Sequence, residues 1–170
     1  MLIAAPHLAA ESRTCAPLQG PRDWSVSFTV KGPAADGEVS PADGRRVGDI
    51  RQTVDVWMGR HGLTHLRYEV LVVVSELVTN AVKHAAGPGC GSVSVTQRFA
   101  GGLLRTEVRD TGSEQPRMQS PAPDCESGRG LSIVSALTEE LGGRWGFDQT
   151  SRTTWCEIPA NPQVATITVS

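Results

Sequence analysis

The sequence predicts an α+β fold in which about three helices cover one face of a mixed β-sheet of about five strands. Residues 66–86 contain many apolar residues and no glycine or proline, which predicts a long and largely buried helix. Residues 24–30 alternate between apolar and polar side chains, as expected of a half-buried strand. Residues 92–99 and 103–110 flank a short Ala-Gly-Gly segment, which is typical of a β-hairpin.

The remaining elements follow from the same periodicities. A first helix is expected from about Pro41 to Arg60, because apolar residues recur there at helical spacing: Val47, Ile50, Val54 and Trp57. Thr64 is the candidate N-cap of the long helix. A third helix is expected over residues 130–141, and residues 144–148 and 153–158 predict a last pair of strands.

The chain is expected to form one domain over residues 24–159, since its length suits a single hydrophobic core. Residues 1–23 lack periodicity and are interpreted as an N-terminal extension. Residues 111–129 include three prolines and no apolar period, which predicts a long loop of the kind that forms a lid over a site. Residues 160–170 form a C-terminal tail without an assigned role.

Composition narrows the class of protein. A net charge of −2 and a pI near 6.1 give no electrostatic reason to expect nucleic-acid binding. The sequence has no membrane-spanning apolar run and no secretory signal, so we expect a cytoplasmic protein that does not associate with membranes. Its cysteines are widely scattered: Cys15, Cys90, Cys125 and Cys156. They could form two disulfides, but separate thiols are expected in the cytoplasm.

Polar residues recur along the long helix at a spacing of four. Glu76, Asn80 and His84 therefore lie on one stripe of its surface. A carboxylate or an amide in a buried helix is costly unless something satisfies it. Two interpretations remain open for this stripe alone. It is either the partly solvated edge of an ordinary amphipathic helix, or a surface that directs the acid and the amide toward a metal ion or a reacting water.

Two short downstream motifs favour the interpretation that the stripe faces a ligand. The predicted strand that ends at Asp110 continues into Thr111 and Gly112, and Gly128-Arg129-Gly130-Leu131 opens the third helix. Taken singly, the first is a strand-end turn and the second a flexible helix entry. In this order and at these separations, the segment 75–84 and the two motifs resemble the N, G1 and G2 boxes of the GHKL ATP-binding superfamily. The resemblance covers residues 24–159, and segment 75–84 is especially similar to the small bacterial anti-sigma factor serine kinases.

The resemblance implies a Bergerat-type fold that binds ATP and Mg²⁺. Asn80 matches the asparagine that holds the ion, and an amide oxygen is a ligand that Mg²⁺ prefers. Glu76 matches the acid that accepts a proton from the attacking hydroxyl. Asp110 matches the aspartate that accepts a hydrogen bond from the adenine amino group, which selects adenine over guanine. Gly112 would let the backbone pass close to the base, and Thr153 matches a strand threonine that assists Asp110.

The sequence has no Walker A loop and no protein-kinase glycine-rich loop, so the phosphates must be held in another way. A glycine-rich helix start offers free backbone N–H groups and the positive end of the helix dipole. These properties suit four consecutive residues: Gly128, Arg129, Gly130 and Leu131. The guanidinium of Arg129 could also neutralise γ-phosphate charge. Lys83 and His84 lie at the end of the N box, near the expected phosphates, although a histidine in such a position is more often structural.

Two classes of function are compatible with these residues. In the first, the protein is a serine kinase that phosphorylates a small anti-sigma factor antagonist of the STAS type and otherwise sequesters a sigma factor; a homodimer is possible in this subfamily. In the second, it is a nucleotide-gated binding module that transfers little phosphate. Retention of the acid Glu76 favours the kinase. Three departures from the family pattern concern other positions: Glu114 replaces the second G1 glycine, Ser151 begins a terminal motif that is commonly Gly-x-Thr, and the lid at 111–129 is rich in proline. Glu114 and the unusual lid favour the binding module.

Overall fold

The computed structural model describes residues 23–31, 39–85, 91–112 and 129–160. The elements are, in chain order, β1 (Asp23–Val30), α1 (Pro41–Arg60), a 3₁₀ turn (Thr64–Leu66), α2 (Arg67–His84), β2 (Gly91–Ala100), β3 (Leu103–Asp110), α3 (Gly130–Glu140), β4 (Arg144–Asp148) and β5 (Thr153–Pro159). The predicted α+β class is confirmed, with three α-helices and five strands among these residues. The expected extension and tail, except for Asp23 and Ala160, and the expected lid at 113–128 lie outside the described residues.

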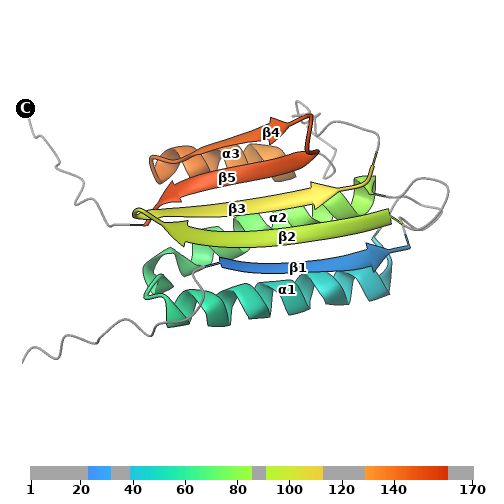
Figure 1. Ribbon diagram of the computed structural model, residues 1–170, viewed down its shortest axis with the longest axis horizontal. Coiled ribbons are helices and arrows are strands. Elements are labelled where there is room, and N and C mark those ends of the chain that lie inside the picture. The colour runs from blue at the N-terminus through green and yellow to red at the C-terminus, as the bar shows by residue number, and fades with distance from the viewer. Residues whose placement is uncertain (1–22, 32–38, 86–90, 113–128, 161–170) are drawn as a thin grey trace, which may run out of the picture.

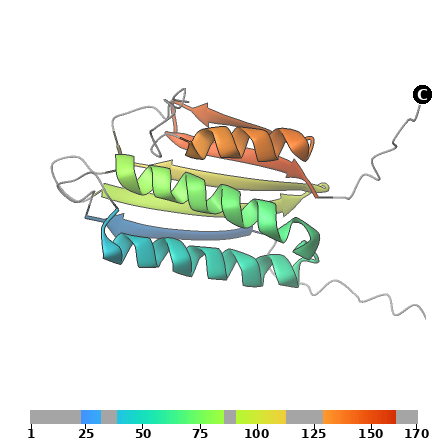
Figure 2. The ribbon, with the colours of Figure 1, turned by 180° about the vertical axis from the view of Figure 1, so that it is seen from behind.

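The helices and the sheet form two layers. The five strands lie side by side in the order β1-β2-β3-β5-β4 (Figure 1). All three α-helices cover the same face of this sheet, with α2 between α1 and α3 (Figure 2). Helix α2 contacts both neighbouring helices and also packs on β2 and β3. It is therefore the central helix of the domain.

The sheet is antiparallel at every described pairing, and this corrects the mixed sheet expected from the sequence. Two helices separate β1 from β2, so the chain reverses direction three times before β2 begins. After β3, the chain passes through α3 and β4 before the β4–β5 hairpin inserts β5 beside β3. Strands β3 and β4 run in the same direction, but β5 lies between them, so no parallel pair forms there.

The starts of α1 and α2 differ in how they are stabilised. Ser40 caps α1, because its hydroxyl oxygen accepts a hydrogen bond from the backbone N–H of Asp43 at 3.2 Å. The expected N-cap of α2, Thr64, is wrong: Thr64 instead begins the 3₁₀ turn, and Leu66 precedes α2 without a side-chain cap. Leu63 and Leu66 are both buried, so apolar packing rather than a polar cap positions the start of α2.

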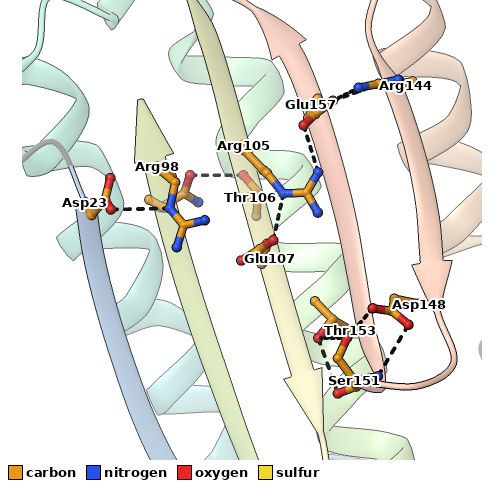
Figure 3. Close-up of polar contacts among 11 residues, drawn as sticks. Asp23, Arg98, Arg105, Thr106, Glu107, Arg144, Asp148, Ser151, Thr153 and Glu157 are labelled. Atoms are coloured by element: carbon orange, nitrogen blue, oxygen red, sulfur yellow. Dashed lines mark hydrogen bonds and ion pairs between the residues drawn. The ribbon is translucent and has the colours of Figure 1, made fainter. Parts of the chain in front are cut away.

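The core lies between the two layers, and α2 supplies much of it: Val70, Val73, Val74, Leu77, Val78, Ala81 and Val82 are buried. The opposite face of the sheet is polar. Ser25 bonds Thr96 and Ser27 bonds Ser94 there, between β1 and β2. Figure 3 shows charged pairs on neighbouring strands, among them Arg105 with Glu157 at 2.7 Å. This division of apolar and polar side chains leaves the helix-facing side of the sheet as the side on which the predicted site residues can meet.

Candidate functional site

The polar stripe of the long helix exists as predicted. Glu76, Asn80, Lys83 and His84 all lie on α2 and are all partly exposed, whereas the opposite side of the helix is buried in the core. At 100° per residue, these four positions fall within an arc of about 100° on the helix surface. The stripe therefore presents a carboxylate, an amide, an ammonium and an imidazole group along one side of α2.

Close contact with α2 explains why the position two residues after Asp110 is a glycine. A Cβ atom placed on Gly112 would lie 1.9 Å from the backbone carbonyl oxygen of His84. No side chain can be accommodated at that distance, because the obstructing atom belongs to a helix backbone. The end of β3 is thus held directly against the last turn of α2.

The second motif also reaches α2, about two turns earlier. A Cβ atom on Gly130 would lie 2.6 Å from the carboxylate oxygen Oε2 of Glu76. Gly130 is the first residue of α3, so the carboxylate of Glu76 lies against the start of that helix. The two glycine-containing motifs, which are separate in the sequence, are therefore brought to the same stripe of α2.

The start of α3 retains features of an anion-binding helix terminus. Arg129 occupies the N-cap position and makes no side-chain cap hydrogen bond to the described residues. Its side chain is exposed, whereas Leu131 is buried and anchors the first turn. The first backbone N–H groups of a helix have no partner within the helix, and the dipole there is positive. Gly128, the remaining residue predicted for this role, lies outside the described residues.

Asp110 is a buried carboxylate at the end of β3. Its side chain is 6% exposed, and its Oδ1 atom accepts a hydrogen bond from the backbone N–H of Gly112 at 2.8 Å. The Nη2 atom of Arg152 lies 3.5 Å from the same oxygen and forms an ion pair with it. A hydrogen-bond donor and a cationic group thus converge on one oxygen of this carboxylate.

Thr153 lies on the other face of the sheet from Asp110. It pairs in register with Arg109, the residue before Asp110, and successive residues of a strand point to opposite faces. Its hydroxyl accepts a hydrogen bond from the hydroxyl of Ser151 at 3.0 Å, beside Asp148 (Figure 3). The structure brings together Asp110 and Arg152, and it does not bring Thr153 to the carboxylate by a direct contact.

Sequence reasoning did not assign a role to Arg152. It recognised the terminal motif around Thr153 but treated the position before this threonine as variable. Arg152 reaches Asp110 only because β5 inserts beside β3, and this strand order is not readable from local periodicity. One signal could have revealed the role of Arg152. It is a basic residue directly before β5, and the first residue of β5 pairs with the end of β3.

Comparison with protein families agrees with this arrangement. The sequence matches the model of the histidine kinase-like ATPase domain over residues 40–154, which is more than half of the chain. The chain belongs to this family. The matched segment includes all three contact regions on α2, β3 and α3, and membership implies that the domain binds ATP.

Solved structures of histidine kinases are similar to this chain. The blue-light activated histidine kinase of Erythrobacter litoralis EL346 is 26% identical, with a TM-score of 0.45, over 58% of this chain and 32% of that protein. The histidine kinase domain of the same enzyme is 23% identical, with a TM-score of 0.46, over 69% of this chain and 61% of the domain. The chain thus spans less than two thirds of either relative. No curated protein matches the sequence.

None of the helices in residues 23–31, 39–85, 91–112 and 129–160 combines the length and the apolar character needed to cross a bilayer.

Proposed function

We propose that this protein is an ATP-dependent protein serine kinase of the anti-sigma factor type. The observation that carries the proposal is the convergence of three motifs on α2. Gly130 lies against Glu76, and Gly112 lies against His84, so one glycine of each flanking motif meets an opposite end of the N-box segment. A nucleotide that spans this distance would contact an adenine-selecting carboxylate at one end and a helix N-terminus at the other.

The chemistry at each end of the proposed nucleotide site indicates which part of ATP binds there. Asp110 is a hydrogen-bond acceptor when ionised, which suits the amino group of adenine and disfavours the carbonyl of guanine. The N–H groups at the start of α3 suit phosphate oxygens, and Lys83 adds a positive charge on the same side of α2. Gly112 approaches the α2 backbone closely, so the end of β3 packs directly against α2 beside the proposed position of the base.

The residues on α2 also fit a magnesium ion. Asn80 is partly exposed and lies one turn from Glu76, so its amide oxygen is accessible to a hard cation. When bound, Mg²⁺ would neutralise charge on the phosphate oxygens of the nucleotide. Asn80 is the residue that would hold it, together with the phosphates and water.

Glu76 is the proposed general base. It would accept the proton of a serine hydroxyl as the serine oxygen bonds to the γ-phosphorus of ATP and the bond from that phosphorus to the leaving oxygen of ADP breaks. The absence of a side chain at Gly130 gives its carboxylate room beside α3. The products of this step are phosphoserine, ADP and a protonated Glu76.

The proposed partners rest on the likeness of segment 75–84 to the anti-sigma factor kinases. The serine would belong to a small antagonist of the STAS type, and the unoccupied kinase would sequester a sigma factor in the cytoplasm. Retention of a carboxylate at Glu76 supports phosphotransfer over the nucleotide-gated binding module, since a pure binder has no use for a base at that position.

A capture experiment tests the proposal. The tagged protein is incubated in native cell lysate with Mg-ATP or Mg-ADP, and captured proteins are analysed by mass spectrometry for phosphoserine. We expect a small partner that gains acid-stable phosphoserine with ATP. Glu76→Gln should retain ATP binding and abolish this modification, while the exposed control Glu139→Gln should behave as the parent.

Three other outcomes would contradict the proposal. Equal phosphorylation by the parent and Glu76→Gln would show that Glu76 is not the general base. Acid-labile phosphorylation of the partner would indicate a histidine rather than a serine target. Partners that change with the nucleotide but never gain phosphate would establish the nucleotide-gated binding module instead.

A further inference from the structure

Arg152 approaches the buried carboxylate of Asp110 from the turn that precedes the neighbouring strand β5. The last paired residues of β3 and β5 are Arg109 and Thr153, and Arg152 lies one position beyond this pair. Its Nη2 atom is 3.5 Å from Oδ1 of Asp110. The arginine side chain is 27% exposed and the aspartate 6%, so the pair is largely shielded from water. A guanidinium group in this position acts on the carboxylate that we assign to adenine selection.

The two oxygens of Asp110 are used differently. The N–H of Gly112 at 2.8 Å and the guanidinium of Arg152 at 3.5 Å both approach Oδ1. A guanidinium that blocked the carboxylate would be expected to engage both oxygens in a bidentate pair. The shortest contact of the guanidinium is instead with Oδ1, the oxygen that also accepts from Gly112, so Oδ2 is the oxygen that we assign to the ligand.

The backbone of Arg152 adds an independent observation. Its φ angle is 54°, and it is the one non-glycine residue with positive φ in the described part of the chain. The left-handed conformation is unfavourable for a residue with a Cβ atom, and it persists where the surroundings require it. A glycine at this position would adopt the same conformation without that cost. The presence of an arginine at this position indicates that its side chain makes an interaction that offsets this cost, such as its contact with Asp110.

We propose that Arg152 is a positioning residue of the nucleotide site. It holds Oδ1 of Asp110 together with the N–H of Gly112, so that Oδ2 is directed toward the amino group of adenine. This inference rests on the proposed function, because it requires Asp110 to bind adenine. It adds a specificity-determining residue outside the three sequence motifs, contributed by the turn before β5 rather than by α2, β3 or α3.

The test compares two nucleotides by isothermal titration calorimetry. One is ATP, and the other is purine riboside triphosphate, which lacks the 6-amino group. Arg152→Gly removes the guanidinium, and relief of the positive φ angle offsets part of the cost of leaving Asp110 without its ion-pair partner. Arg152→Lys retains the charge. Arg109→Ala is the matched control, because it removes an exposed arginine from the adjacent position on the other face of the sheet.

Arg152→Gly should weaken ATP binding roughly tenfold, as expected for loss of one well-oriented hydrogen bond. Its affinity for purine riboside triphosphate should stay within about twofold of the parent, since that nucleotide makes no use of Oδ2. Arg152→Lys should retain part of the preference for ATP, and Arg109→Ala should retain all of it. The melting temperatures are measured in parallel, because loss of the ion pair with Asp110 lowers stability and relief of the positive φ angle raises it. A merely structural role of the arginine would not produce a difference between the two nucleotides.

Other outcomes would overturn the inference. Tighter ATP binding by Arg152→Gly would show that the arginine obstructs the site, and equal weakening for both nucleotides would show a general effect on the fold. If the parent binds ATP and Asp110→Asn weakens that binding, but Arg152→Gly does not, the inference fails while the proposed function stands. If the parent binds neither nucleotide, the proposed function fails and the inference fails with it.

Discussion

Gly130 and Glu76 are in contact across the α2–α3 interface. A Cβ atom on Gly130 would lie 2.6 Å from Oε2 of Glu76, at the far end of a flexible side chain. The comparable position at Gly112 faces the backbone carbonyl oxygen of His84 at 1.9 Å. A side chain can move and a helix backbone cannot move without disrupting its hydrogen bonds. Substitutions of the two motif glycines are therefore expected to have different effects, on activity at Gly130 and on stability at Gly112.

Substitution of Gly130 should affect activity more than stability. In Gly130→Ala, the new methyl group would displace the carboxylate of Glu76, which can rotate away at little cost. We expect the free energy of unfolding to change by less than about 1 kcal/mol and the rate of phosphotransfer to fall at least roughly tenfold, as for a misplaced general base. Chemical denaturation and a phosphotransfer assay measure the two effects. An unchanged transfer rate would show that the position of Glu76 is not critical.

Substitution of Gly112 should affect stability directly. Gly112→Ala would force the end of β3 away from the last turn of α2, with an expected loss of about 2 kcal/mol or more in the free energy of unfolding. Gly48→Ala on α1 is the control, since nothing lies within 4 Å of its Cβ position. That control should gain up to about 1 kcal/mol from helix propensity. Similar stabilities for the two variants would contradict the close approach at Gly112.

Asn80 should determine the magnesium dependence of nucleotide binding. Asn80→Ala removes the amide oxygen that we assign to the ion, so ATP affinity measured with Mg²⁺ should fall to the level measured with EDTA. Gln52→Ala, an amide truncation at an exposed position of α1, should retain the full effect of magnesium. The free energy of unfolding is measured in parallel to verify that the variant is folded. If Asn80→Ala still binds ATP more tightly with Mg²⁺ than with EDTA, Asn80 is not a ligand of the metal ion.

Glu157 should make stability depend on pH in the acidic range. A hydrogen bond from Arg105 at 2.7 Å, with a second from Arg144, lowers the pKa of this carboxyl although partial burial opposes the shift. Because the folded pKa lies below the unfolded value of about 4.3, the stabilisation is complete above that value and is lost as pH falls through the folded pKa. Figure 3 shows Glu157 between the two arginines.

We therefore expect Glu157→Gln to be less stable than the parent by about 1 kcal/mol at pH 7. The difference should shrink as the pH falls below the unfolded pKa, because the parent carboxylate becomes protonated and loses the same interaction. Denaturation curves at pH 7 and at decreasing acidic pH measure it, with the exposed Glu139→Gln as the control. A difference that is constant across this range would exclude the ionised carboxylate as its source.

The helices and strands were predictable because their signals are local. Strand β3 and helix α1 have the expected bounds, since period-two and period-3.6 patterns depend on residues a few positions apart. The predicted cap at Thr64 failed where burial of Leu63 and Leu66 outweighed the preference for a polar cap. The antiparallel pairing of the sheet was also missed, because it depends on where the β4–β5 hairpin inserts rather than on any strand's own sequence.

The sequence by itself determined the elements, the three motifs and the residue types that suit adenine, phosphate and magnesium. The tertiary structure decided which of those residues meet. Packing of the core against α2 places Gly112 beside His84 and Gly130 beside Glu76, and the register of β3 with β5 brings Arg152 rather than Thr153 to Asp110. Local propensity acts over a few neighbouring residues, whereas these contacts join distant segments that only the burial of a common core brings together.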